Sequence, residues 1–166
     1  MFKKIDIETL QFNPVTMIGE EWMLISAGNR KKFNTMTASW GSLGQMWGRR
    51  NVTVYIHPQC HTREFVDDSK LFTLSFFPPE YRKALELCGT KSGRDADKAA
   101  EAGLTPYFIG RTVAFEQASL ILICRKLHSM AFSEEGFTAP EVMEKFYPEE
   151  DFHIIYTGEI LKALTK

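Results

Sequence analysis

The chain has 166 residues, of which 44% are hydrophobic and 25% are charged, a balance typical of a globular domain. Twenty lysine and arginine residues nearly offset 21 aspartate and glutamate residues, which leaves a formal net charge of -1. A domain that binds nucleic acid usually carries a basic excess, so this balance argues against such a partner. We expect a single domain over residues 1–166, with a core that folds without disulfides or a structural metal.

The chain has no segment typical of membrane or secreted proteins. No apolar run approaches the roughly 18 residues of a membrane span, and the start at Met1 is followed by charged residues instead of a signal-peptide core. The three cysteines, Cys60, Cys88 and Cys124, are far apart and odd in number, which favours reduced thiols. We therefore expect a cytoplasmic protein with no membrane partner.

Short strand-like segments dominate the chain. Seven segments rich in β-branched and aromatic residues predict strands, at 23–26, 34–40, 52–56, 71–76, 113–115, 119–125 and 152–160. Helices are predicted at 79–88, at about 95–102, and from Thr138, which has capping-box spacing with Glu141. Because regular helices do not separate the strands, the pattern indicates a mainly β, antiparallel barrel with short helical insertions.

The densest polar stretch is residues 88–98, between two predicted helices. It offers two glycines, two hydroxyls, three cations and the N–H groups of a helix start, a combination that suits a phosphate. Its spacing matches neither the GxGxxG fingerprint nor a Walker loop. The alternative is a solvated turn in which Ser92 and Asp95 only cap a helix.

The segment 34–44 is a second candidate for ligand binding. As a strand it places Thr35, Thr37 and Ser39 on one face, and Gly41 and Gly44 then allow close approach of the backbone to a flat ligand. This combination suits a polar aromatic ligand. The alternative is a half-exposed strand whose threonines reflect β propensity alone.

The segment 57–62 holds the only local cluster of metal-ligand residue types, His57, Cys60 and His61. Their spacing matches no standard zinc pattern, and the alternative is a strand end followed by a helix that Thr62 caps. We expect no metal. Because the chain also lacks a GxSxG elbow, the sequence identifies no nucleophile.

Taken together, several motifs resemble the flavin reductase-like family of FMN-binding split barrels. They are Asn-Thr-Met-Thr-Ala-Ser-Trp-Gly at 34–41, Pro-Gln-x-x-Thr at 58–62, Phe-Thr-Leu-Ser-Phe at 72–76, Tyr-Arg-Lys-Ala-Leu at 81–85, Cys-Gly-Thr-Lys-Ser-Gly-Arg-Asp-x-Asp-Lys at 88–98 and Gly-Leu-Thr-Pro at 103–106. The resemblance spans roughly residues 15 to 127. It implies an antiparallel Greek-key split β-barrel that forms a homodimer, with FMN at or near the subunit interface.

The resemblance also implies which residues bind the cofactor. Along the isoalloxazine ring and ribityl chain it implies Thr37, Ala38, Ser39 and Trp40, and on the phosphate side it implies His61, Thr62, Ser92, Arg94 and Lys98. Relatives often carry Arg-Tyr where this chain has Cys60-His61, so a permanent cation is replaced by a thiol and an imidazole. That departure implies either a lower affinity for the phosphate or a larger share of its binding by Arg94 and Lys98.

The implied activity is hydride transfer between NAD(P)H and the flavin. The cofactor supplies this chemistry, so no catalytic side chain is expected. Two alternatives stay open. One is a flavoredoxin-like electron-transfer protein with bound FMN, and the other is a non-enzymatic split-barrel binding module.

Overall fold

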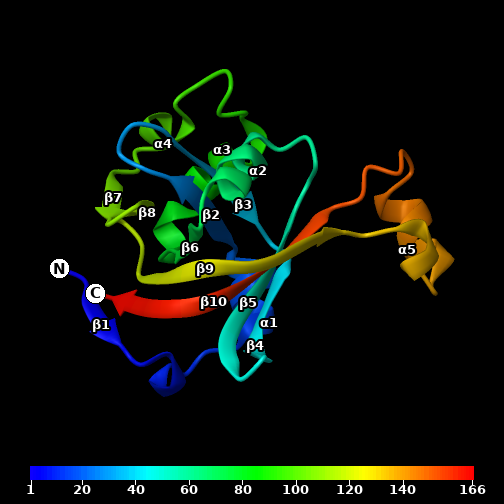
Figure 1. The fold of residues 1–166 in the computed structure, drawn as a ribbon. Coiled ribbons are helices and arrows are strands. Elements are labelled where there is room, and N and C mark those ends of the chain that lie inside the picture. The colour runs from blue at the N-terminus through cyan, green and yellow to red at the C-terminus, as the bar shows by residue number, and fades with distance from the viewer.

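The computed structural model describes residues 1–166 and is built on one antiparallel sheet of eight strands (Figure 1). These strands are β1 (Lys3–Ile5), β2 (Met23–Gly28), β3 (Phe33–Ala38), β4 (Gly41–Met46), β5 (Arg49–Ile56), β6 (Leu71–Phe76), β9 (Leu120–Ala131) and β10 (Ile154–Thr165). Seven of them follow the order β3-β2-β6-β9-β10-β5-β4, and β1 pairs with β10. A separate hairpin is formed by β7 (Pro106–Ile109) and β8 (Thr112–Phe115).

The two edges of this sheet are consecutive in the chain. The strands β3 and β4 stand at opposite ends of the strand order, yet only Ser39 and Trp40 separate them. The sheet must therefore curl round until its edges approach each other, while β3 and β4 share no paired residues. The result is an open, split barrel, which confirms the predicted fold class.

Two apolar clusters stabilise the fold, one inside the barrel and one outside it. On β9, Leu120, Leu122 and Cys124 belong to the interior cluster, whereas Ile121 and Ile123 belong to the outer one. Burial of both faces explains why this strand reads as an unbroken apolar run.

The helices are short and lie in different parts of the molecule. They are α1 (Pro14–Thr16), the π-helical turn η2 (Met17–Glu21), α2 (His61–Asp68), α3 (Arg82–Thr90), α4 (Lys98–Glu101) and α5 (Pro140–Phe146), with 3-10 turns η1 (Ile7–Thr9), η3 (Pro79–Tyr81) and η4 (Glu134–Gly136). Ala84, Leu85 and Cys88 of α3 lie in the outer cluster, which fixes α3 on the barrel wall. None of the helices has the length and apolar character needed to cross a membrane.

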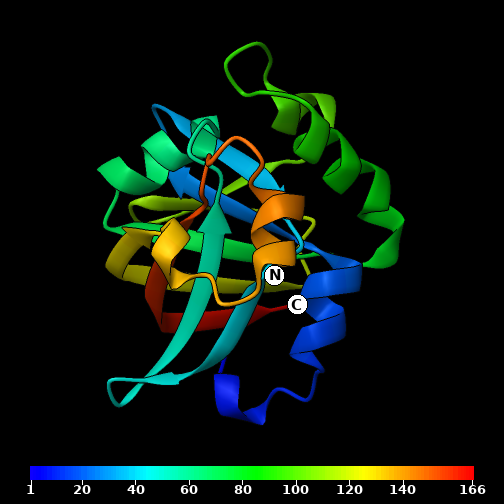
Figure 2. The same cartoon turned by 90° about the vertical axis from the view of Figure 1, so that its right-hand side faces the viewer.

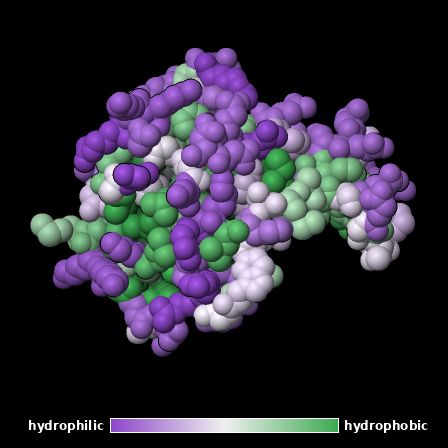
Figure 3. Space-filling view, in the orientation of Figure 1, coloured by the Kyte–Doolittle hydropathy of each residue, from purple (hydrophilic) through white to green (hydrophobic).

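The long strands β9 and β10 continue beyond the barrel as an arm. This arm, residues 132–153, carries η4 and α5, and projects to the right in Figure 1. Figure 2 looks along the arm toward the barrel. In Figure 3 hydrophilic side chains cover the upper region around α2, α3 and α4, whereas pale and green residues gather along the arm.

All seven predicted strands are present, and three further strands escaped prediction. The missed strands are β1, β4 and β7. Gly41 and Gly44, which we expected to lie against a ligand, instead belong to β4, paired with β5. The predicted helix at 79–88 is the turn η3 followed by α3.

Three details of the helix predictions were wrong. The helix expected from about residue 95 begins only at Lys98, and Asp97 caps it by accepting a hydrogen bond from the Ala100 N–H at 3.1 Å. The N-cap position of α5 is Ala139 and has no side-chain hydrogen bond, so Thr138 forms no capping box. Thr62 lies within α2 and does not cap it.

Candidate functional site

A polar cleft lies where β3, the junction of β5 with α2, and the connection from α3 to α4 meet. Its volume is about 340 Å³. Its lining residues are Asn34, Met36, Thr37, His57, Gln59, Cys60, His61, Cys88, Gly89, Thr90, Lys91, Ser92, Gly93, Arg94 and Lys98. The cleft therefore brings together parts of the three segments that the sequence analysis singled out.

Gly89 in the last turn of α3 and Gly93 in the α3–α4 connection allow this part of the chain to lie directly on β3. A Cβ atom at Gly93 would lie 2.2 Å from Oδ1 of Asn34, and one at Gly89 would lie 3.3 Å from Cβ of Thr37. Asn34 is itself buried and donates to the Thr62 hydroxyl at 3.3 Å, so its side chain cannot easily move away from an added Cβ atom. Any side chain at residue 93 would push the connection away from the barrel and distort the cleft.

Lys98 is a buried cation on the cleft wall. It is only 5% exposed, and its Nζ donates to the carbonyl oxygens of Cys88 at 2.9 Å and Lys91 at 3.1 Å. These carbonyls belong to the C-terminal end of α3, where the helix dipole favours a positive charge. No carboxylate pairs with it, and burial lowers the pKa of Lys98. Because an ammonium has three N–H donors, one remains for a ligand.

Arg94 is held at the mouth of the cleft by α2. Its guanidinium pairs with the Glu64 carboxylate and donates to the Gln59 carbonyl oxygen at 3.2 Å. The hydrogen bond from Arg94 is the main cause of the lowered pKa of Glu64. The Ser92 hydroxyl accepts a bond from the Arg94 N–H at 3.2 Å, which leaves its own O–H free to donate.

His61 lines the cleft, but Thr62 lies beneath it. The His61 Nδ1 atom is buried and lies 3.2 Å from Oε2 of Glu64 without hydrogen-bond geometry, so this nitrogen has no directed partner. Thr62 is fully buried, with Asn34 as its partner, and is not part of the lining. The structure thus places Thr62 in a supporting position under the expected phosphate side.

Of the four residues expected along the flavin ring, only Thr37 lines the cleft. Its hydroxyl donates to the Leu85 carbonyl of α3. Ala38 is buried opposite Met23, and Ser39 follows it, half-buried, outside the paired strands. Thr35 also has an internal partner, the Ser26 hydroxyl at 2.7 Å. The threonine hydroxyls of β3 therefore bond to the protein's own groups.

Trp40 faces the arm instead of the cleft. It is 42% exposed, and its ring centroid lies 5.4 Å from that of Phe146 and 5.0 Å from that of His153. Trp40 and Phe146 border an apolar hollow of about 280 Å³. It is lined by Trp40, Tyr55, Phe132, Phe137, Val142, Phe146 and Tyr147.

The sequence analysis missed a polar network between the cleft and the arm. His57 Nε2 lies 2.7 Å from Oδ2 of Asp151, and His153 Nδ1 lies 3.0 Å from the Tyr147 hydroxyl. The two imidazole rings are 5.4 Å apart, and burial, with His57 nearby, lowers the pKa of His153. The only sequence signal for this network is the cluster of His57, Cys60 and His61, which the sequence analysis considered as metal ligands.

The three residues of that cluster have separate partners. His57 contacts Asp151, the Cys60 thiol lies 3.5 Å from the Met36 sulfur, and His61 lies beside Glu64. Nowhere in the chain do three His, Cys, Asp or Glu side chains converge as metal ligands would.

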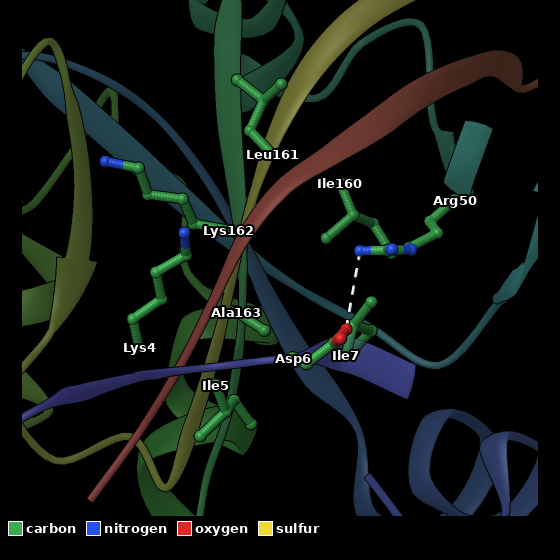
Figure 4. A pocket seen from close by; sticks show the side chains of 9 residues that line it. All are labelled: Lys4, Ile5, Asp6, Ile7, Arg50, Ile160, Leu161, Lys162 and Ala163. Atoms are coloured by element: carbon green, nitrogen blue, oxygen red, sulfur yellow. Dashed lines mark ion pairs between the residues drawn. The ribbon is translucent and has the colours of Figure 1, made fainter. Parts of the chain in front are cut away.

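A further pocket lies between β1 and β10, apart from the polar cleft (Figure 4). Its volume is about 320 Å³, and Asp6 and Arg50 in its wall lie 3.5 Å apart as an ion pair. It shares no residue with the cleft.

A family model for the flavin reductase like domain matches residues 17–165. The chain belongs to the flavin reductase-like family. No curated protein sequence matches the chain at a significant level. This family membership agrees with the resemblance found in the sequence motifs, and it extends to the long strand β10 at the C-terminal end.

Solved structures of this type share the fold at low sequence identity. An FMN-binding domain of a flavin reductase-like enzyme from Shewanella baltica superposes with a TM-score of 0.70 at 17% identity, covering 99% of this chain and 77% of that one. A flavoredoxin from Methanosarcina acetivorans gives 0.70 at 20% identity, covering 99% and 76%. An NADH:FAD oxidoreductase from Streptomyces globisporus, in complex with NAD and FAD fragments, gives 0.65 at 14% identity, covering 88% and 74%.

The polar cleft of this flavin reductase-like chain fits the phosphate end of a flavin mononucleotide. A free N–H of Lys98, the O–H of Ser92 and the buried His61 ring nitrogen without a directed partner all belong to its wall. Phosphate dianions accept strong hydrogen bonds from such donors. Ser92 and Lys98 would therefore hold the phosphate, and Arg94, which shares the cleft wall with them, would contribute if its guanidinium turned from Glu64.

Proposed function

We propose that this single-domain chain binds FMN in the polar cleft, with the phosphate at Ser92, Arg94 and Lys98. The observation that supports this most strongly is the environment of Lys98, a buried ammonium without a carboxylate partner. Burying an unpaired charge is costly, and a bound phosphate dianion would offset that cost. Membership of the flavin reductase-like family also supports the binding of a flavin.

The flavin ring would then extend toward the end of β3. Pairing of β3 with β2 ends at Ala38, and pairing of β4 with β5 begins at Gly41. Ser39 and Trp40 lie outside both ladders, so their backbone groups are available to the polar edge of a ring. In this proposal Thr37 and Ala38 form the protein surface beside the flavin ring.

We further propose that the protein is an NAD(P)H-dependent flavin reductase. When bound, the flavin would supply the redox chemistry of hydride transfer. The chain's own residues bind the phosphate, orient the ring and exclude water from its face, and no side chain is required as a general acid or base. The similarity to an NADH:FAD oxidoreductase supports this activity.

The proposal includes a cytoplasmic homodimer. Trp40 and Phe146 are 42% and 44% exposed, and the hollow between barrel and arm is lined entirely by apolar residues. Such a surface is commonly covered by a partner, and a second copy of the same chain is the commonest one. Light scattering is expected to give twice the chain mass of 19.0 kDa.

The visible spectrum of the purified protein is the first test. We expect flavin absorbance near about 450 nm that denaturation releases, and flavin-free protein that takes up FMN at micromolar concentration. Stoichiometric NADH or NADPH oxidation with FMN would then support the reductase. Tight FMN binding without this oxidation favours an electron-transfer protein, which the similarity to a flavoredoxin also suggests. A protein that binds no FMN would contradict the proposal and favour a non-enzymatic module.

A further inference from the structure

A second hollow of about 420 Å³ adjoins the polar cleft. The two share five lining residues, Asn34, His61, Gly93, Arg94 and Lys98. These shared residues include two of the three proposed phosphate partners. The hollow thus continues past the end at which a mononucleotide flavin would terminate.

Three consecutive cations of the loop between β2 and β3 line this hollow. They are Arg30, Lys31 and Lys32, and none of them pairs with a carboxylate. Arg30 lies over the Phe108 ring at 4.9 Å, and the Lys32 ammonium lies 5.1 Å from the Phe65 ring centroid. Their charges are therefore available to a ligand, apart from these cation–π contacts.

The loop that carries these cations is tightly closed. The Asn29 N–H donates to the Lys32 carbonyl oxygen at 2.8 Å, and the Asn29 side chain accepts a bond from the Lys31 N–H at 2.9 Å. Gly28 has a φ of 115°, a conformation that favours glycine. The three cations are thus presented by a loop with a defined shape.

The charge of the hollow contrasts with that of the whole chain. Five cations line it, whereas only two carboxylates do so, those of Asp95 and Asp97. Asp97 is already engaged in capping α4. The chain as a whole has a net charge of -1, so a positive hollow is a local feature and favours an anionic ligand group.

We propose that this hollow binds the second phosphate and the adenosine of a dinucleotide flavin, so that the chain binds FAD more tightly than FMN. This inference rests on the proposed function, because it extends the same ligand beyond the phosphate at Arg94 and Lys98. The Arg30–Lys32 loop is the specificity-determining segment. The half-buried Phe33 in the wall offers an apolar surface to the adenine base.

The test is calorimetric titration of flavin-free protein with FAD and with FMN. In a K31A/K32A double variant we expect the FAD affinity to fall by about 3- to 30-fold, because two exposed charge contacts are lost, while the FMN affinity changes by less than about twofold. Added salt should weaken FAD binding more than FMN binding in the wild-type protein. Lys83→Ala is the matched control, since Lys83 is exposed on α3 and lines neither hollow.

Each outcome has a separate meaning. FMN binding with no preference for FAD in the wild-type protein would overturn this inference and leave the proposed function standing. Equal losses of FAD and FMN in the double variant would also overturn it, and so would an unchanged FAD affinity together with a raised KM for NADPH, which would assign the loop to the nicotinamide nucleotide. Failure to bind either flavin would instead contradict the proposed function itself.

Discussion

The two sides of the barrel opening differ in chemistry although both are closed by a connection between regular elements. On one side the α3–α4 connection forms a polar cleft with a buried, unpaired Lys98. On the other side the arm between β9 and β10 forms an apolar hollow with exposed Trp40 and Phe146. The first surface is suited to a charged small ligand, and the second to an apolar contact.

The two surfaces are joined through the segment that crosses the split in the barrel. Thr37 lies in the cleft, and Trp40, three residues later, lies against the arm. His57 lines the cleft and contacts Asp151 of the arm at 2.7 Å. A ligand that extends from Lys98 along β3 would therefore reach the arm. The polar cleft would hold the phosphate end of such a ligand, and the region near Trp40 would hold its ring end.

Lys98→Ala should have the largest effect on the polar side. Loss of one charge-assisted contact costs about 1.5 to 3 kcal/mol, so FMN affinity should fall by roughly 10- to 150-fold. Riboflavin, which lacks the phosphate, should bind the variant nearly as well as it binds the wild-type protein. Fluorescence titration with both ligands makes the comparison. Equal losses for the two ligands would place Lys98 away from the phosphate.

Gly93→Ala should disrupt the cleft through sterics. The added Cβ would lie 2.2 Å from the Asn34 side chain, so the connection must move, at a cost of about 1 to 3 kcal/mol in unfolding free energy. FMN binding should weaken with it, and Asn34→Ala in the same chain should restore part of the stability. Gly44→Ala is the control, because nothing lies within 4 Å of a Cβ there. Equal stability of the two alanine variants by urea denaturation would contradict this account.

Much of the fold could be predicted because local pattern and burial agree. The strand predicted at 71–76 matches β6, which is buried along almost its whole length. The strand β4 escaped because Gly41 and Gly44 have low β propensity, and it is held by pairing with β5 instead. Pairing partners far apart in the chain cannot be seen in a local window.

The site could be predicted only in part, for a similar reason. The polar density of residues 88–98 pointed to the right segment, but the burial of Lys98 depends on α3 carbonyls that lie over it in the folded chain. Thr62 and Trp40 belong to motifs in the sequence, yet Thr62 lies on the buried face of α2 and Trp40 faces the arm. The basic hollow joins two loops more than 60 residues apart, and no local pattern indicates it.

Phe146→Ala tests the apolar side. If a second copy covers the arm, removing this aromatic ring should weaken dimerisation by about tenfold, because alanine buries less apolar surface at the interface than phenylalanine does. Light scattering over a dilution series measures the change. Phe137→Ala, from the same hollow, supplies a second variant. A wild-type protein that is monomeric at micromolar concentration would contradict the proposed dimer.

Acidification should loosen the contact between arm and barrel by a smaller amount. Burial and the nearby His57 lower the pKa of His153, so its neutral form is favoured in the docked arm. This stabilisation is fully present above the ordinary value of about 6.5 and is lost as the pH falls through the lowered pKa. The Trp40 ring lies 5.0 Å from His153, so its fluorescence should report the change between about pH 8 and pH 5. The profile should flatten in His153→Gln and in Trp40→Phe; an unaltered profile in either variant would rule out this origin.

Glu64→Gln should have the smallest effect and the opposite sign. Glu64 now pairs with Arg94 and thereby competes with a phosphate for the guanidinium. The amide keeps the shape of the side chain but removes its charge, so Arg94 is released toward the cleft and FMN affinity should rise by about two- to fivefold. Riboflavin affinity should stay unchanged, which separates a gain at the phosphate from a general change of the cleft. Calorimetric titration of both ligands decides the question. A fall in FMN affinity would mean that Glu64 holds Arg94 in its binding position, and the phosphate end would then need both α2 and the α3–α4 connection intact.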